Sequence, residues 1–330
     1  MPGRRTIGVD MGGSKLLAGA VDTGLSVHHR AQRTLTGLDQ TSLLDVAVDA
    51  VNETRQDAGG EVVGVGFGIP SLIDQRTGRA VVSINLDLAD ISFEDVMRER
   101  LGLPVFVDND ANMAALAEHR AGAAFGCREV VLLTIGTGIG GGLILRDELY
   151  RGAIGSAAEL GHMVIDENGP PCQGNCPNHG CVEAMASGTA LAREATRLAS
   201  ERPDSGLAAA VADGHTLAGP LVTELAHDGD DAAIEVIELI GSRLGVAISS
   251  YVNIFNPEVV VIGGGVMAAG ELLLEPIRRS VATRALPPSR DMVRIVMAEF
   301  GVEAGMIGAA TLAFGGLGVH AGRKRAGGDA

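Results

Sequence analysis

Two short apolar runs, joined by a polar and glycine-rich turn, open the chain. Residues 7–9 and 16–21 are apolar and partly β-branched, and the turn between them reads DMGGS. This pattern predicts two strands connected by a tight turn. The same pattern recurs more than a hundred residues later in the segment EVVLLTIGTGIGGGLILRDEL. The repetition predicts two related α/β lobes, with a ligand in the crevice beyond the carboxyl ends of their strands.

Apolar residues at helical spacing predict the main helices. They recur over 41–58, and the strand LPVFV leads into a second helix that begins near Asp110. The longest helix is expected to end at Asn256-Pro257, since proline cannot continue it. A buried strand, EVVVIGGG, then precedes another helix. Together with a length of 330 residues, these elements predict an α/β protein of two domains.

Charge and composition restrict the partners. The formal net charge is −15, from 26 Lys and Arg against 41 Asp and Glu, which argues against nucleic acid or an anionic membrane. No apolar run reaches the roughly 18 residues that span a bilayer. The opening MPGRRTIGVD contains no apolar segment of the kind found in signal peptides. We therefore predict a soluble cytoplasmic protein.

Three of the four cysteines lie within ten residues, at Cys172, Cys176 and Cys181. A disulfide is disfavoured in a reducing cytosol, and the spacings C-x3-C and C-x4-C are not the redox motif C-x-x-C. One His and three Cys form a tetrahedral set typical of structural zinc, and His162 is the expected fourth ligand. His179 is the alternative fourth ligand. An incidental cluster in a glycine- and proline-rich loop is the alternative to any metal.

Both glycine-rich turns carry groups that suit phosphates. The first combines a carboxylate, two glycines, a hydroxyl and an ammonium group: Asp10, Gly12, Gly13, Ser14 and Lys15. Such a set fits a phosphate with Mg²⁺. In the second turn, glycines around Thr137 and Gly138 form a G-x-G-x-x-G pattern, but a strand follows instead of a helix. Backbone N–H groups that approach phosphate oxygens are therefore favoured over a dinucleotide fold.

A third glycine run, Gly263, Gly264 and Gly265, follows a strand and precedes a helix. The pattern G-x-G-x-x-A fits dinucleotide binding, but no acidic residue follows at the spacing that ribose recognition requires. Bare backbone at this position also suits the base and ribose of a mononucleotide. Dinucleotide binding, with an oxidoreductase function, is therefore kept as the lesser alternative.

Polar residues near the predicted turns are candidate sugar ligands. Asn109 and Asp110 lie at a strand-to-helix junction, where either residue could simply cap the helix. A carboxylate there could instead accept a hydroxyl proton during phosphoryl transfer. The chain has no Trp and two Tyr, so hydrogen bonds rather than stacking would hold a sugar. The candidate ligands for this role are Asn85, Asn109, Asp110, Glu159, His162 and Glu183.

Taken together, these motifs resemble the ROK family (repressors, open reading frames and sugar kinases), and its glucokinase branch most closely. The stretches that carry the resemblance span nearly the whole chain: VDMGGSK, GFGIPSLID, VDNDANMAAL, TIGTGIGGG, GSAAELGH, the cysteine loop with GCVEAMASG, and NPEVVVIGGGV. The resemblance implies a two-lobed actin/hexokinase-like (ribonuclease H-like) α/β ATPase fold, with a zinc-bearing loop in the larger lobe. We predict a small lobe over 1–112 completed by a helix over 303–318, a larger lobe over 113–302, and a disordered tail over 319–330.

The resemblance also implies an ATP-dependent hexose kinase that makes glucose 6-phosphate. Asp110 would be the general base, and the remaining candidate ligands would hold the sugar. The first two turns would line the phosphates of ATP, with Mg²⁺ held through water by Asp10, and Gly263 to Gly265 would line the adenosine. His162 and the three cysteines would bind zinc, which would fix the flanking sugar ligands. A homodimer or a tetramer of dimers is expected.

The chain departs from the usual family pattern in three places. The first gap in the cysteine loop has three residues instead of one, Ala158 replaces a glycine, and Ser71 stands where glycine is frequent. If the glycine replaced by Ala158 adopts positive φ, the alanine is strained. Another hexose or N-acetylhexosamine (N-acetylglucosamine, N-acetylmannosamine, mannose, fructose or allose) is the alternative substrate. A non-catalytic sugar sensor is the alternative class, while a DNA-binding repressor is disfavoured because the first strand begins near Thr6.

Overall fold

The computed structural model describes residues 3–83 and 86–323, and the chain forms two compact units. The first unit comprises the chain up to Val130, the segment Gly142–Ala158 and the chain from Glu299 onward. The second comprises Val131–Gly141 and Glu159–Ala298. The first unit therefore extends beyond the predicted boundary at residue 112. Helix α3 (Asp110–Ala121) crosses that boundary and packs against α11 (Ala304–Gly316), which accounts for its place in the first unit.

Two five-stranded sheets repeat one strand order. The first is β3-β2-β1-β4-β8, and the second is β11-β10-β9-β12-β13. In the first sheet, β1 is antiparallel to β2 and parallel to β4. The predicted pairs of strands are therefore β1 with β2 and β9 with β10, at equivalent positions in the two sheets. The bounds are β1 Arg4–Met11, β2 Lys15–Asp22, β3 Val27–Thr34, β4 Glu61–Ile69, β8 Val105–Asn109, β9 Val130–Ile135, β10 Ile139–Leu145, β11 Glu148–Leu149, β12 Val259–Gly263 and β13 Arg294–Met297.

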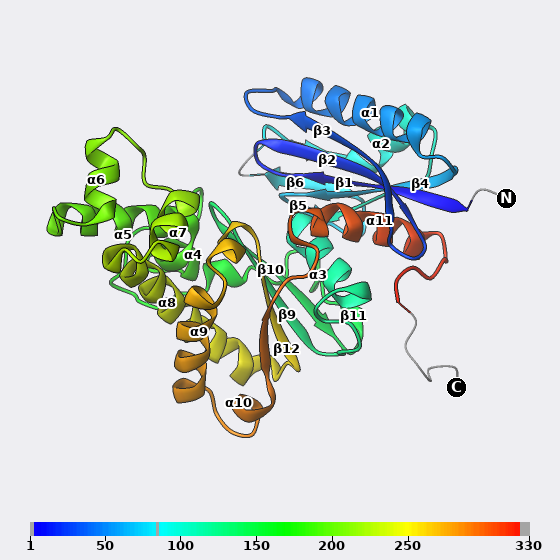
Figure 1. Cartoon of the computed structure of the whole chain (residues 1–330). Coiled ribbons are helices and arrows are strands. Elements are labelled where there is room, and N and C mark those ends of the chain that lie inside the picture. Colours follow the sequence, from blue (N-terminus) through cyan, green and yellow to red (C-terminus); the bar gives the residue numbers. More distant parts are fainter. Residues whose placement is uncertain (1–2, 84–85, 324–330) are drawn as a thin grey trace. The chain divides into compact units, whose positions relative to one another are not determined.

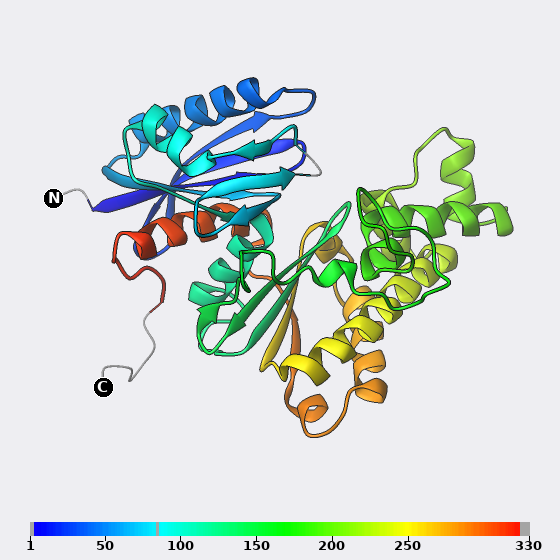
Figure 2. The same cartoon turned by 180° about the vertical axis from the view of Figure 1, so that it is seen from behind.

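Helices cover both faces of the first sheet. Figures 1 and 2 show α1 on one face and α11 on the other. Helix α11 approaches closely because Gly8 and Gly66 face it: a Cβ on either glycine would lie 1.8 Å from a carbonyl oxygen of this helix. Thr6 adds a hydrogen bond of 2.9 Å from Oγ1 to the carbonyl of Ala310. The helices of this unit are α1 Gln40–Asp57, α2 Phe93–Leu101, α3 Asp110–Ala121 and α11 Ala304–Gly316.

The second unit is mainly helical, and α8 with α9 forms its most extensive helix pair. Asn256 ends α8 in the left-handed conformation, with φ of 47°, directly before Pro257 as the sequence predicts. The helices are α4 Val182–Ala186, α5 Gly188–Glu201, α6 Gly206–Ala212, α7 Gly219–His227, α8 Asp231–Phe255, α9 Glu271–Arg284 and α10 Ser289–Met292, with short 3-10 turns η1 Leu160–His162 and η2 Gly265–Ala269. A third 3-10 turn, η3 Gly301–Glu303, precedes α11 in the first unit.

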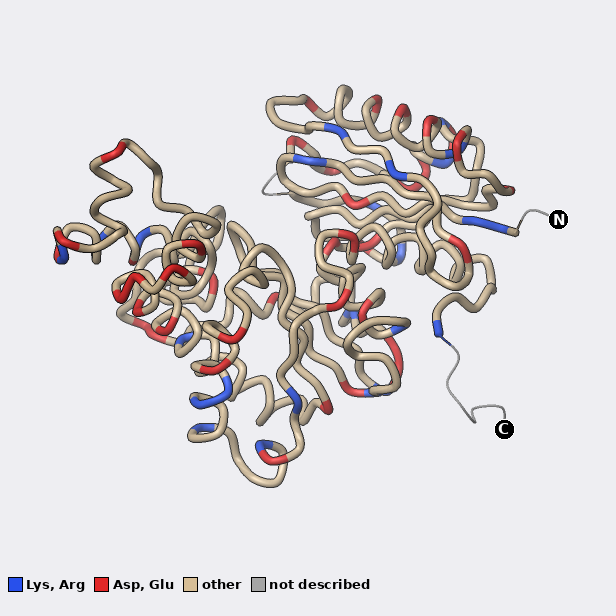
Figure 3. The backbone as a smooth tube through the Cα atoms, viewed as in Figure 1, with Lys and Arg blue, Asp and Glu red and all other residues tan. Residues whose placement is uncertain are grey.

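The rest of the first unit adds a small sheet and an ordered segment after α11. The sheet β5-β6-β7 consists of β5 Ser71–Asp74, β6 Arg79–Ser83 and β7 Ala89–Ile91. Residues 319–323 differ from the predicted disorder, since Gly322 donates to Thr23 and the Arg323 N–H donates to Arg120. Acidic residues are spread along α1 and the helices of the second unit (Figure 3). Within the described ranges, no helix has the length and apolar character needed to cross a bilayer.

Candidate active site and metal centre

The first turn connects β1 and β2 and lies near a buried carboxyl group. The N–H of Gly12 donates to the carbonyl of Lys15 at 2.8 Å, which closes the turn. Asp10, near the end of β1, contacts Gly305 of α11 so closely that a Cβ there would lie 2.5 Å from Oδ2. Burial, together with the negative charge of Asp110, raises the pKa of Asp10 to about 7. A bound cation would reverse this effect, so Asp10 is suited to a site for Mg²⁺.

Asn109 and Asp110, at the junction between β8 and α3, occupy different positions relative to the helix. Asn109 is the N-cap of α3, and its Oδ1 accepts the N–H groups of Ala111 at 2.9 Å and Asn112 at 3.3 Å. The capping alternative therefore applies to Asn109. Asp110 is the first helical residue, and the charge of its carboxylate acts on Asp10. The amide nitrogen of Asn109 is not part of the cap, which leaves it available to a ligand.

Asp108 holds this junction in place, and sequence reasoning missed it. The side chain is fully buried. Its Oδ1 accepts the Asn109 N–H at 2.7 Å and the Asn112 side-chain amide at 2.9 Å. Its Oδ2 accepts Nε of Arg151 at 2.6 Å. The run DND was a visible signal for Asp108, but no sequence pattern connects it to Arg151, 43 positions later.

The second turn, between β9 and β10, is supported by α4 and α5. Glu183 on α4 accepts the N–H of Ile139 with Oε2 at 2.7 Å. A Cβ on Gly138 would lie 2.4 Å from the same oxygen, so only glycine allows this approach. The N–H of Gly188, the first residue of α5, donates to the carbonyl of Gly136 at 2.7 Å. Glu183, a predicted sugar ligand, thus also holds the backbone of the predicted phosphate turn.

The glycine run after β12 is built for close backbone approach. Gly264 has φ of +90°, and a Cβ there would lie 2.4 Å from the carbonyl oxygen of Ile135 in β9. Around Gly265 nothing lies within 4 Å of the Cβ position, so the backbone is open to a ligand. The residues that follow form η2 rather than an α-helix, and α9 begins only at Glu271. Because the dinucleotide motif requires a helix directly after its glycines, this geometry disfavours it.

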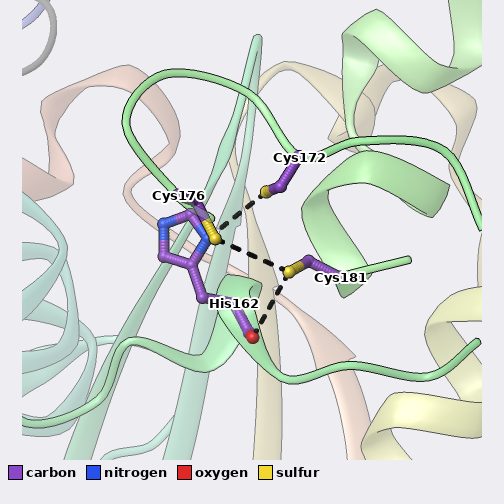
Figure 4. Close-up of side chains that lie close together, drawn as sticks. All are labelled: His162, Cys172, Cys176 and Cys181. Atoms are coloured by element: carbon purple, nitrogen blue, oxygen red, sulfur yellow. Dashed lines mark hydrogen bonds between the residues drawn. The ribbon is translucent and has the colours of Figure 1, made fainter. Parts of the chain in front are cut away.

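His162 and the three predicted cysteines come together in the second unit. Their ligand atoms all lie within 4.8 Å of one another, and Figure 4 shows the side chains gathered around a common centre. Cys172 Sγ is 3.5 Å from Nδ1 of His162, and the sulfurs of Cys176 and Cys181 are 3.8 Å apart. His179 is not in this group, and its Nδ1 lies 3.3 Å from the carbonyl oxygen of Gly169. The longer first gap in the loop thus leaves Cys172 within the group.

The chemistry of this group fits a zinc ion. Burial and the neighbouring thiols raise the pKa of Cys172 to about 12. Three thiolates so close together require a cation, and one imidazole nitrogen with three sulfurs is a closed tetrahedral set for zinc. With Nδ1 of His162 facing the sulfurs, Nε2 faces the other way and lies 4.0 Å from Oε2 of Glu159. The imidazole can therefore bind a metal and still offer a donor to a sugar hydroxyl.

The segment before His162 contains the strained residue that the sequence pointed to. Ala158 has φ of +67°, so the position that is usually glycine in the family does adopt the left-handed conformation. Glu159 follows it with an exposed side chain, and Tyr251 anchors the next residue through a 2.6 Å hydrogen bond to the Leu160 carbonyl. Asn85 lies outside the described residues.

The predicted site residues are divided between the two units. The first unit carries Asp10, Gly12, Gly13, Ser14, Lys15, Asn109 and Asp110. The second carries Thr137, Gly138, Glu159, His162, Cys172, Cys176, Cys181, Glu183, Gly263, Gly264 and Gly265. The first glycine-rich turn thus lies in one unit and the second, at residues 136–138, in the other.

Comparisons with known proteins show that the chain is similar to bacterial glucokinases over most of its length. The chain is 36% identical to the glucokinase of Halalkalibacterium halodurans over 93% of its length and 94% of that protein. It is 35% identical to the glucokinase of Thermotoga maritima, over 94% of this chain and 98% of that protein. The ROK glucokinase of Streptomyces griseus in complex with glucose and AMPPNP matches with a TM-score of 0.84 and 34% identity, over 94% of this chain and 99% of that one.

Regulators also resemble this chain, at lower identity. The xylose repressor of Bacillus spizizenii is 28% identical over 93% of this chain and 76% of the repressor. The ROK family model matches residues 6–315, which include the cysteine loop and, apart from the first two residues of β1, both five-stranded sheets. The chain therefore belongs to the ROK family.

Proposed function

We propose that this protein is an ATP-dependent glucokinase that transfers the γ-phosphoryl group of ATP to the 6-hydroxyl of glucose. The observation that carries the proposal is the placement of Asp10 and Asp110 in the first unit: Asp10 packs at the end of β1 against Gly305 of α11, and Asp110 begins α3 directly after its cap. The negative charge of Asp110, with burial, raises the pKa of Asp10, so Asp10 can serve a cation and Asp110 a proton. The glucokinases of more than 30% identity, and the related structure with glucose and AMPPNP, support the choice of substrates.

Asp110 would act as the general base. It is the first residue of α3, directly after Asn109, and a carboxylate at such a junction can accept the proton of an attacking hydroxyl. Asn109 would bind the sugar through its amide nitrogen, while Asp108 and Arg151 fix the junction that orients both residues. Glu159, His162 and Glu183 would bind further hydroxyls, and we extend this role to Asn85 from the sequence alone.

The two turns would bind the phosphates of ATP. Backbone N–H groups of Gly13, Thr137 and Gly138, with the side chains of Ser14 and Lys15, are the proposed donors. Gly12, whose own N–H closes the turn, would line the phosphates because it has no side chain. The open backbone from Gly263 to Gly265 would lie along the adenosine. Asp10 would hold Mg²⁺ through water, and the ion would supply electrostatic stabilisation of the transferring phosphoryl group.

Zinc would have a structural role in this enzyme. His162, Cys172, Cys176 and Cys181 would hold it, and the metal would supply rigidity to the loop without taking part in phosphoryl transfer. Since His162 is in the group and Glu183 follows Cys181 by two residues, the loop fixes two proposed sugar ligands. A cytoplasmic location and a dimeric or tetrameric assembly remain predictions.

A coupled assay of ADP release tests the proposal. Zinc-replete protein is given Mg·ATP with a panel of hexoses and N-acetylhexosamines, and polyphosphate is tested separately as donor. We expect glucose to give a kcat/KM well above that of every other sugar. A different sugar in first place would keep the kinase and replace its substrate. Flat activity across the panel, with glucose still bound, would reject the kinase and favour a sugar sensor.

The variant Asp110→Asn tests the mechanism. It removes the proton acceptor and keeps the shape, so we expect kcat to fall by about 10²–10⁴-fold while glucose affinity stays within about threefold. Asp49→Asn makes the same change at an exposed position of α1 and should leave kcat unchanged. Near-normal kcat in Asp110→Asn would remove Asp110 from the role of base. Isothermal titration with glucose and initial-rate kinetics provide the two readouts.

A non-catalytic sugar sensor is the alternative, which the comparisons do not favour because the identity to the xylose repressor is lower than that to the glucokinases. Such a protein would bind its sugar without needing ATP. Glucose titration with and without Mg·AMPPNP separates the candidates, because a kinase binds both ligands and a regulator of this kind binds the sugar alone.

A further inference from the structure

The lengthened cysteine loop contacts the second phosphate turn through Gln173. This residue lies in the three-residue gap between Cys172 and Cys176. Its side-chain Nε2 donates to Oγ of Ser187 at 3.1 Å and approaches the carbonyl oxygen of Thr137 at 3.4 Å. A gap of one residue, as in the usual family loop, contains no comparable stretch between its cysteines. The departure in loop length thus brings a contact with the turn.

The carbonyl of Thr137 has a second partner on α5. Oγ1 of Thr189 donates to it at 2.9 Å. The preceding carbonyl, that of Gly136, accepts the N–H of Gly188 at 2.7 Å. Ser187, which receives Gln173, is the N-cap of the same helix. Two successive peptide groups of the turn are therefore oriented from one place, the start of α5.

Because the peptide group is rigid, these contacts to the carbonyl groups also determine the direction of the backbone N–H groups in the turn. A trans peptide unit is planar, so its C=O and the following N–H point in opposite directions. Holding the carbonyl of Thr137 toward Gln173 and Thr189 aims the N–H of Gly138 away from them. Gly136 and Thr137 are exposed, and glycine allows peptide orientations that other residues resist. Without the side-chain donors, the turn would sample orientations in which these N–H groups point elsewhere.

We propose that Gln173 and Thr189 are positioning residues for the nucleotide phosphates, and that Gln173 links the metal-binding loop to the phosphate turn. The inference rests on the proposed function, since it takes ATP as the ligand of this turn. Neither residue touches the reacting atoms. Their effect is to fix the backbone N–H groups of Thr137 and Gly138 before the nucleotide binds, which lowers the ordering cost of binding.

Isosteric variants test the proposal in the full-length protein. Gln173→Met keeps the length of the side chain and removes its N–H donors without adding charge. Asn175→Leu is the matched control, because it makes the equivalent change at an exposed position of the same loop. Thr189→Val removes the hydroxyl, and Thr189→Ser retains it. For each protein, Kd is measured by isothermal titration for Mg·AMPPNP and for glucose, and zinc content is measured by mass spectrometry.

We expect Gln173→Met and Thr189→Val each to raise the Kd of Mg·AMPPNP about 3- to 10-fold, the effect of one lost hydrogen bond. The glucose Kd and the zinc content should stay at wild-type values, and Asn175→Leu and Thr189→Ser should bind AMPPNP normally. Equal AMPPNP affinity in Gln173→Met and Asn175→Leu would overturn the positioning role of Gln173 and leave the proposed kinase function intact. Loss of zinc or of glucose affinity in Gln173→Met would overturn it in favour of a role in loop folding. Wild-type protein that binds no AMPPNP would reject the proposed function as well.

Discussion

At the residue scale, Asp10 makes stability depend on pH. Its pKa is about 7 in the folded protein, raised by burial and by Asp110, against about 3.8 for an ordinary Asp. The folded state therefore holds the proton more tightly than the unfolded state, and stability decreases as pH rises from about 4 to about 7. Without Mg²⁺, the free energy of unfolding of Asp10→Asn relative to that of wild type should therefore increase by about 2 kcal/mol as the pH rises from 5 to 8. Thermal melting at several pH values measures this difference, and parallel curves for the two proteins would contradict it.

Ala158 leads to a second prediction at this scale. A non-glycine residue at φ of +67° is strained by about 1 kcal/mol or more. Ala158→Gly should therefore stabilise the protein by about 0.5–1 kcal/mol, after the larger entropy loss of glycine is subtracted. Ala157, its neighbour, is not among the residues at positive φ, and Ala157→Gly should destabilise by a similar amount. Urea unfolding compares the two variants. A destabilised Ala158→Gly would mean that strain at this position is small.

At the element scale, α11 requires glycine at position 308 but not two turns later, at position 315. A Cβ on Gly308 would lie 1.7 Å from the carbonyl oxygen of Met113 in α3, whereas Gly315 has nothing within 4 Å. Gly308→Ala must push the two helices apart and should cost about 1–3 kcal/mol or more. Gly315→Ala, at an exposed position near the C-terminal end of the same helix, should be neutral or stabilise by up to about 1 kcal/mol. Chemical denaturation measures the free energy of unfolding of both variants. Equal effects would show that the close packing of α11 against α3 does not determine the cost of the substitution.

The sequence predicted those elements whose signal is local. The strand–turn–strand pairs, α1, α3, α8 and β12 each follow from apolar spacing and from residues such as Pro257 within the same stretch. Contacts between distant segments had no such signal. Arg151 reaches Asp108 across 43 positions, and Thr189 reaches Thr137 across 52. The candidate ligands could therefore be named from motifs, while the residues that orient them needed the fold.

At the scale of the whole molecule, the cysteine group lies in one unit only. Zinc should be present at about one ion per chain, and a chelator should remove it. Because the first unit has a hydrophobic core of its own, the loss of zinc should lower hydrogen-exchange protection in 160–200 and leave β1 and β4 protected. Mass spectrometry of exchanged peptides measures both regions. Uniform loss of protection would show that the metal stabilises the entire chain, and no loss would remove its structural role.

The position of helix α11 also has a consequence for folding during synthesis on the ribosome. The helix covers the sheet that contains β1, and Thr6 meets Ala310 across 304 positions of sequence. Translation delivers the N-terminal strands first, at about 5–20 residues per second. During most of synthesis, the nascent sheet would have one face without its helix, at the row of Gly8 and Gly66. The N-terminal strands are made first, but their unit is completed only when the ribosome has passed residue 316.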